Sequence, residues 1–167
     1  MTAVNVKLSG VGSDWTKPCL QAVTDLNSLF KRNSIKVMLA TGGSTRPTIT
    51  VKTDPSIPGT TVHGETTTEF NGSGNLLRAE VRLPVKVTIN TPQGVRDAGL
   101  GILDVIAAHE FVHALGHSGH NSHLMDQTMS KEMGNSAAGD KLKAGAVKMP
   151  PLMLSPQSVK DLKAIWP

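Results

Sequence analysis

The sequence predicts a single α+β domain over residues 1–167, with one twisted mixed sheet, a long internal helix and a C-terminal helix. Segments that alternate apolar and polar residues are interspersed with segments of helical periodicity, in the order strand, helix, strands, helix, long loop, helix. A chain of 167 residues is long enough to bury one core. We find no internal repeat and no linker, so one domain is expected.

Four segments show the alternation or the short apolar run that is typical of strands, and they span residues 4–10, 35–40, 46–54 and 76–90. The last segment contains Pro84, which removes one backbone donor from a strand ladder. We therefore expect residues 76–90 to form an edge strand. The loop-rich residues 54–75 are expected to hold at most one short strand.

Three segments favour helices, and they span residues 13–32, 99–116 and 154–167. Pro18 suits the first turn of the first helix, and Asp97 is a good cap for the second. Gly116 is expected to end the second helix. Ser155 should cap the third helix, with Pro156 in its first position. Residues 131–151, rich in Gly, Ala and Lys, are expected to form a long loop.

Composition and charge disfavour several function classes. The net charge is +4 and the sequence pI is about 9.4, but lysines and arginines are scattered, which indicates a basic surface rather than a nucleic-acid groove. No segment is apolar enough to cross a membrane, and the first residues do not resemble a signal peptide, so we expect a soluble, cytoplasmic or particle-associated protein. The single cysteine, Cys19, excludes an internal disulfide. We expect a buried structural thiol there, with a metal-blocking thiolate as the alternative.

Five of the six histidines lie in the stretch HEFVHALGHSGHNSH, residues 109–123. On a helix, His109 and His113 lie one turn apart on the same face, where both imidazoles can bind one metal ion. Glu110 lies beside them, where its carboxylate can accept the proton of a water activated by the metal. Two surface histidines would also produce this motif. However, the intervening residues are apolar, and buried histidines need partners. We therefore expect a Zn²⁺ ion.

A catalytic zinc ion usually has three protein ligands, and the third remains open at this point. His117 follows His109 by eight residues, and on a continuing helix it would lie about 12 Å farther along the axis. A turn at Gly116 would instead bring the chain back, and it needs a few residues to do so. Reach therefore favours His120 over His117, while His123 requires a wider loop.

The stretch HEFVHALGHSGH followed by LMD resembles the metzincin zinc peptidases, and most of all their matrixin branch. The family pattern is HExxHxxGxxH, followed by a turn that holds a methionine beneath the metal. The matching positions are His109, Glu110, His113 and Gly116. Met125 fits the methionine turn, with Met129 as the other candidate. The resemblance is specific over residues 109–126 and loose elsewhere, where the order of elements and the final helix are similar.

One departure from the family pattern concerns the third histidine, whose place is taken by Gly119. An insertion would make His120 the ligand, and a deletion would make it His117. The spacing is similar to that of phage-encoded peptidases of this type, in which the late histidine precedes Ser or Asn, as His120 precedes Asn121. The chain has no tyrosine. It therefore lacks the transition-state tyrosine of astacin-like and serralysin-like members, which matrixin-like members also lack.

The resemblance implies a zinc-dependent endopeptidase in which Glu110 is the general base and the substrate is a protein or peptide. We expect the substrate to lie extended along residues 76–90, with residues 131–151 forming one wall of its side-chain pocket. The alternative is a structural or virion-associated protein that keeps a zinc site without proteolytic activity. Replacement of Glu110 would distinguish the two.

Several other residues have expected places. His63 is isolated and is expected on the surface or in a loop, with a second metal site there as the alternative. Asp104 belongs either to a polar helix face or to the surroundings of a ligand. Asp126 either hydrogen-bonds a ligand histidine or forms a turn. Trp15 and Trp166 are expected to anchor the core.

Overall fold

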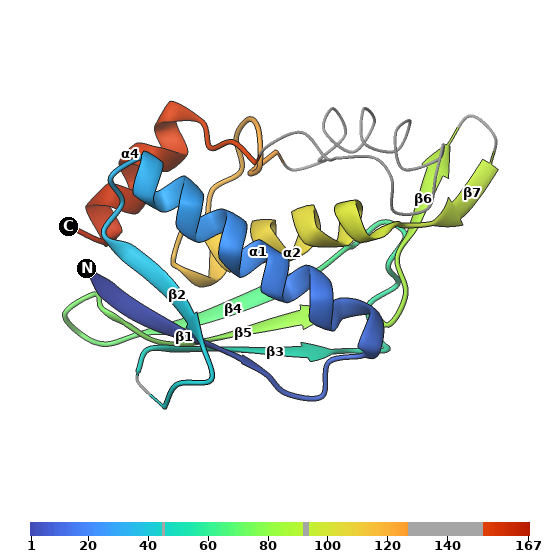
Figure 1. The fold of residues 1–167 in the computed structure, drawn as a ribbon, viewed down its shortest axis with the longest axis horizontal. Helices are drawn as coiled ribbons and strands as arrows, with labels where there is room; N and C mark the ends of the chain where they lie inside the picture. The colour runs from blue at the N-terminus through green and yellow to red at the C-terminus, as the bar shows by residue number, and fades with distance from the viewer. Residues whose placement is uncertain (45, 92–93, 127–151) are drawn as a thin grey trace.

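The computed structural model describes residues 1–44, 46–91, 94–126 and 152–167, and it confirms a mixed α+β architecture (Figure 1). The main sheet contains β1 (Thr2–Leu8), β2 (Val37–Thr41), β3 (Thr48–Thr53), β4 (Glu65–Phe70) and β5 (Leu76–Leu83). Their order is β2-β1-β3-β5-β4, and β4 runs antiparallel to β5 while the other pairs are parallel. Helices α1 (Ser13–Arg32) and α2 (Leu100–Ala114) cover one face of the sheet, and α4 (Pro156–Ile165) packs at one end of this helical layer (Figure 1).

The two faces of the sheet follow from the alternation in its strands. Apolar side chains of β3, such as Ile49 and Val51, are fully buried in the core that the sheet shares with the helices. The intervening polar side chains point to the opposite face, where Lys52 forms an ion pair with Glu80. One face therefore supplies the core and the other meets solvent.

The segment at residues 76–90 is not an edge strand, contrary to the prediction from Pro84. Strand β5 ends at Leu83 and is paired on both sides, with β3 and with β4. Pro84 comes after the last ladder residue, so it removes no bond from the sheet. Its carbonyl accepts a hydrogen bond of 2.7 Å from the indole of Trp15. The edge next to α2 is β4, from the region expected to hold at most one short strand.

A second, two-stranded sheet was not predicted. It pairs β6 (Thr88–Thr91) with β7 (Gly94–Asp97) in antiparallel fashion. Asp97 does not cap α2, because it lies in β7 and forms an ion pair with Lys86 at 3.0 Å. The N-cap of α2 is Gly99, which offers no side-chain bond.

Helix α2 is buried on nearly all sides, which explains why it lacks a polar stripe. It ends where predicted, because Gly116 has a φ of +100° that reverses the chain. A side chain at Gly116 would also approach the ring of Phe70 to 2.9 Å. The turn at this glycine directs the following residues back toward the helix.

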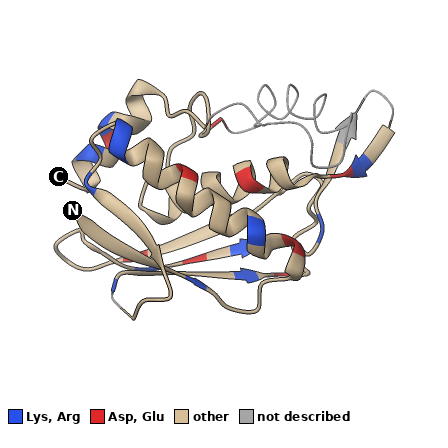
Figure 2. Ribbon diagram, viewed as in Figure 1, with Lys and Arg blue, Asp and Glu red and all other residues tan. Residues whose placement is uncertain are grey.

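Helix α4 begins as predicted, since the Ser155 hydroxyl accepts the Ser158 N–H at 3.0 Å and Pro156 follows the cap. Both tryptophans are buried, and the indole of Trp166 donates to the Leu115 carbonyl at 3.0 Å. Charged side chains are scattered over the sheet and the helices (Figure 2). In the part of the chain that is described, no helix has the length and apolar character needed to span a bilayer.

Candidate metal centre

Three histidine side chains meet beside the end of α2. His109 and His113 come from the helix, and His120 comes from the segment after Gly116. The Nε2 atom of His113 lies 3.0 Å from Nε2 of His109 and 3.2 Å from Nε2 of His120. Tetrahedral zinc with bonds near 2.05 Å separates its nitrogen ligands by about 3.3 Å. The group can therefore hold a metal ion.

Backbone carbonyls orient two of these rings. Nδ1 of His109 lies 2.7 Å from the Leu124 carbonyl oxygen, and Nδ1 of His113 lies 2.6 Å from the His117 carbonyl oxygen. Since a carbonyl only accepts, Nδ1 carries the proton in both rings and donates it. The bare Nε2 lone pairs then face one another. Lone pairs crowded in this way repel unless a cation lies between them, so the donor set fits a metal.

Desolvation lowers the pKa of all three rings, which favours the neutral form that metal binding requires. Desolvation lowers the pKa of His109 from 6.5 to about 4. Desolvation also lowers the pKa of His113 and that of His120, although His120 is less deeply buried than the other two rings. A metal therefore meets little competition from protons near neutral pH.

The other two candidates for the third ligand lie elsewhere, and the choice of His120 agrees with the cluster. His117 is buried, and its Nε2 lies 2.8 Å from the Ser158 hydroxyl oxygen. His123 is exposed, with a φ of +61°, and forms a bridge with Leu154. Neither ring belongs to the metal-binding group.

Met125 lies in a turn that is closed by a hydrogen bond of 3.0 Å from the Asp126 N–H to the His123 carbonyl. Met125 is fully buried, and its carbonyl accepts the Asn121 N–H at 2.8 Å. A place directly beneath the metal stays a prediction. Met129, the second candidate, and the predicted pocket wall at residues 131–151 lie outside the described residues.

Glu110 is enclosed by the edge strand. Its side chain is buried, and Oε2 accepts a hydrogen bond of 2.6 Å from the Thr66 hydroxyl. Gly64 packs against the same carboxylate, so closely that a Cβ at this position would lie 2.7 Å from the Glu110 Cγ, Cδ and Oε1 atoms. Burial raises the pKa of Glu110 above its ordinary value, although the Thr66 hydrogen bond and the nearby His120 act in the opposite direction.

The histidines and Glu110 open into a pocket of about 670 Å³, walled by the segment from Thr61 to Thr68. His63 lies in a loop, as predicted, and its half-buried side chain lines this pocket. Its Nε2 atom is buried and has no hydrogen-bond partner among the described residues, and desolvation lowers the pKa of the ring. The sequence around His63, Gly64 and Thr66 does not indicate that these residues line a pocket with the histidines. Their place beside α2 follows from the pairing of β4 with β5.

Asp104 lies on α2 away from the metal-binding group. It is buried, and the carboxyl of Asp25 on α1 faces it. Desolvation, with Asp25 adding to it, raises the pKa of Asp104 to about 7. The nearby Cys19 is a fully buried thiol, as predicted, and burial raises its pKa to about 12. Such a thiol is protonated near neutral pH.

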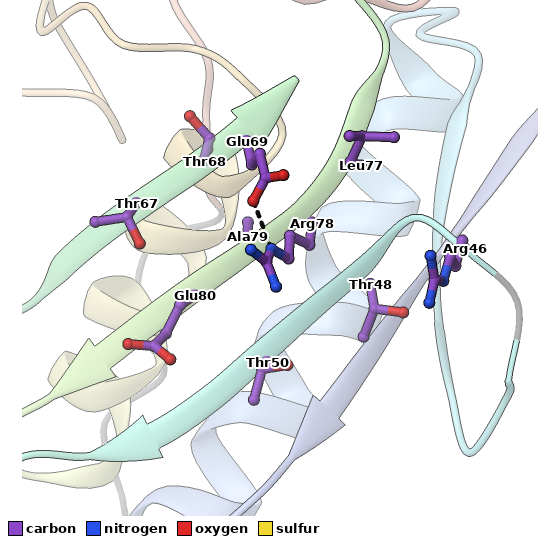
Figure 3. A pocket seen from close by; sticks show the side chains of 10 residues that line it. All are labelled: Arg46, Thr48, Thr50, Thr67, Thr68, Glu69, Leu77, Arg78, Ala79 and Glu80. Atoms are coloured by element: carbon purple, nitrogen blue, oxygen red, sulfur yellow. Dashed lines mark hydrogen bonds and ion pairs between the residues drawn. The ribbon is translucent and has the colours of Figure 1, made fainter. Parts of the chain in front are cut away.

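A second hollow, of about 980 Å³, lies on the solvent face of the sheet (Figure 3). Its lining is mainly polar and includes Thr48, Thr50 and Arg78. Arg78 is already paired with Glu69 at 2.6 Å. The hollow has no histidine among its lining residues and is separate from the metal-binding group.

No known protein family matches the chain, and no curated protein is significantly similar to it in sequence. The likeness to metzincins therefore depends on residues 109–126 and on the order of elements. The geometry of the histidine group carries the functional argument.

Proposed function

We propose that this protein is a zinc-dependent endopeptidase. The observation that carries the proposal is the convergence of three imidazoles beside a buried glutamate at the end of an open pocket. Three histidines that leave a ligand position free are typical of catalytic zinc, whereas structural zinc sites are usually closed by four protein ligands. Imidazole nitrogens also suit Zn²⁺ better than the oxygen-preferring Mg²⁺ or Ca²⁺.

When bound to His109, His113 and His120, zinc would lower the pKa of a water molecule and polarise the scissile carbonyl. Glu110 accepts the proton of the attacking water and passes it to the nitrogen of the leaving amine. Thr66 holds the glutamate side chain through its hydrogen bond to Oε2. The raised pKa of Glu110 makes it a better proton acceptor than an exposed carboxylate.

The substrate would lie along β4. This strand pairs with β5 on one side and forms the edge of the five-stranded sheet on the other. Its residues Thr66 to Thr68 line the pocket that contains the histidines and Glu110. An extended peptide could add to this edge through backbone hydrogen bonds, which would bring its scissile bond past the metal. Strand β4 thus replaces residues 76–90 as the substrate strand.

The test is cleavage of a peptide library by the zinc-loaded protein, read by mass spectrometry, beside the Glu110→Gln variant. Glu110→Gln keeps the three histidines, so we expect unchanged zinc binding and a loss of cleavage by at least about 100-fold, within the range of a general base. The matched control is Glu69→Gln on the same strand, because Glu69 is exposed and pairs with Arg78 on the solvent face. We expect Glu69→Gln to cleave normally.

Two results would contradict the proposal. Equal cleavage by the wild type and Glu110→Gln would remove the general base from the mechanism. Tight zinc binding without cleavage of any peptide would instead support a protein that keeps the metal for structure alone.

A further inference from the structure

His117 is the buried histidine that the metal-binding group does not use. It is 2 % exposed, although it lies in a segment whose neighbours Ser118 and Gly119 are exposed. Both ring nitrogens have partners. Nδ1 accepts the Gly119 N–H at 3.2 Å, and Nε2 lies 2.8 Å from the Ser158 hydroxyl oxygen. A buried imidazole so fully bonded holds its segment in one conformation.

The directions of these hydrogen bonds follow from the available donors. Because Nδ1 accepts from Gly119, the ring proton is on Nε2, which donates to the Ser158 oxygen. The Ser158 hydroxyl in turn donates to Oδ1 of Asn121 at 2.9 Å. The Ser155 hydroxyl donates to the same Oδ1, also at 2.9 Å, and Ser155 accepts the Ser158 N–H as the cap of α4.

This network, which comprises His117, Asn121, Ser155 and Ser158, links α4 to the metal-binding group. Asn121 and His117 lie on either side of His120, one and three residues away. The carbonyl of His117 also receives the Nδ1–H of His113 at 2.6 Å. Two of the three candidate ligands are therefore oriented by residues that the first turn of α4 holds.

The buried position of Ser158 makes the link specific. Ser158 is fully buried, and its hydroxyl contacts both His117 and Asn121. Removing that hydroxyl would leave the Nε2–H of His117 buried without an acceptor, which is costly enough to displace the ring. The displacement would pass to the His117 carbonyl and to the segment that carries His120.

We propose that His117 and Ser158 are positioning residues of the metal centre, and that the docking of α4 completes its geometry. This inference rests on the proposed function, since it assumes that the histidine group binds zinc. His117 acts through His113 and His120 and does not bind the metal. The C-terminal helix, far from the HExxH motif in sequence, thereby sets the zinc affinity.

The main experiment measures the zinc affinity of Ser158→Ala by competition with a chelator, and the visible absorption of its Co²⁺ form. We expect the affinity to fall by about 10-fold, as is typical when a partner of a metal ligand is lost, and the Co²⁺ spectrum to change. The control is Val37→Ala, which removes buried methyl groups from β2 at the opposite edge of the sheet. It should lower the thermal stability but leave both metal readouts unchanged.

A second measurement needs no variant. Histidine ¹⁵N spectra of the metal-free wild type should show His117 protonated on Nε2, and His109 and His113 protonated on Nδ1. A His117 protonated on Nδ1 would overturn the network. So would a Ser158→Ala protein with wild-type zinc affinity, or equal losses of affinity in Ser158→Ala and Val37→Ala.

These outcomes are separable from failure of the proposed function. A wild type that binds zinc but cleaves no peptide refutes the peptidase, while the comparison of affinities still decides the role of Ser158. A wild type without zinc affinity overturns both proposals.

Discussion

Replacing Gly64 with alanine should misplace the general base without removing the metal. The Cβ added at this position would lie 2.7 Å from the Cγ, Cδ and Oε1 atoms of Glu110. Carbon atoms in contact are comfortable at about 3.5–4.0 Å, so the two groups must separate by about 1 Å. Glu110 is 6 % exposed and enclosed, and its carboxylate is also held by Thr66. Either the glutamate moves, or β4 moves and shifts the Thr66 hydroxyl with it.

The expected effect falls on the chemical step. A displacement of about 1 Å at a reacting group can slow catalysis by about 100-fold, equivalent to about 2.7 kcal/mol in the activation free energy. None of the three nearest atoms to the added Cβ belongs to a histidine. The zinc affinity should therefore stay at its wild-type value while kcat falls.

The assay compares kcat on a peptide that the wild type cleaves, with the zinc content of each protein measured in parallel. The control is Gly72→Ala in the turn between β4 and β5, where an added Cβ meets no atom of the described residues within 4 Å. If Gly64→Ala keeps the full kcat with a full complement of zinc, the contact between Gly64 and Glu110 does not position the base and the reasoning is wrong.

Three further predictions concern the metal and the core. His120→Ala should lower the zinc affinity by more than about 100-fold, which exceeds the usual effect of losing a residue that only hydrogen-bonds a ligand. His123→Ala should keep the wild-type affinity, and equal affinities of the two variants in a chelator titration would exclude His120 as a ligand. Removing zinc with a chelator should lower the melting temperature, since free zinc at 100 times its dissociation constant stabilises the fold by about 2.7 kcal/mol. An unchanged melting temperature with and without zinc would show that the ion does not bind the native state. In the folded state the pKa of Asp104 is raised from 3.8 to about 7, so the native protein binds this proton more tightly than the unfolded chain does. The free energy of unfolding therefore falls as the pH rises between those two values, by at most about 1.4 kcal/mol per pH unit. In chelator, Asp104→Asn should abolish that loss in urea titrations at several pH values and the exposed control Asp14→Asn should not; an unchanged pH profile in Asp104→Asn would place the titration elsewhere.

Local patterns predicted several elements well. The helix expected at residues 13–32 has the bounds of α1, because an amphipathic stripe is a property of the segment itself. Pro18, which was expected in the first turn, instead lies inside the helix, five residues after its first residue Ser13. The start of α4 was also predicted, since a serine cap followed by proline acts within one turn. Asp97 was the wrong cap for α2, because the pairing of β6 with β7 draws it into a strand.

Sheet edges were predicted poorly, because an edge depends on which strands are neighbours. Residues 65–70, ETTTEF, lack a buried alternating pattern since most of their side chains are exposed. Pro84 indicated an edge strand, yet β5 ends one residue before it and is paired on both sides. The walls of the pocket at Gly64 and Thr66 were missed for the same reason.

His109, Glu110 and His113 could be placed from the sequence because a helix repeats every 3.6 residues, so their spacing alone brings two imidazoles and a carboxylate to one region. The third histidine could not be assigned in that way. Reach after Gly116 favoured His120, but His117 remained open until the fold placed its ring against Ser158, 41 residues later. Contacts between residues so far apart in sequence arise only when the helices pack, which is why the partners of Glu110 and of the histidines belong to the tertiary structure.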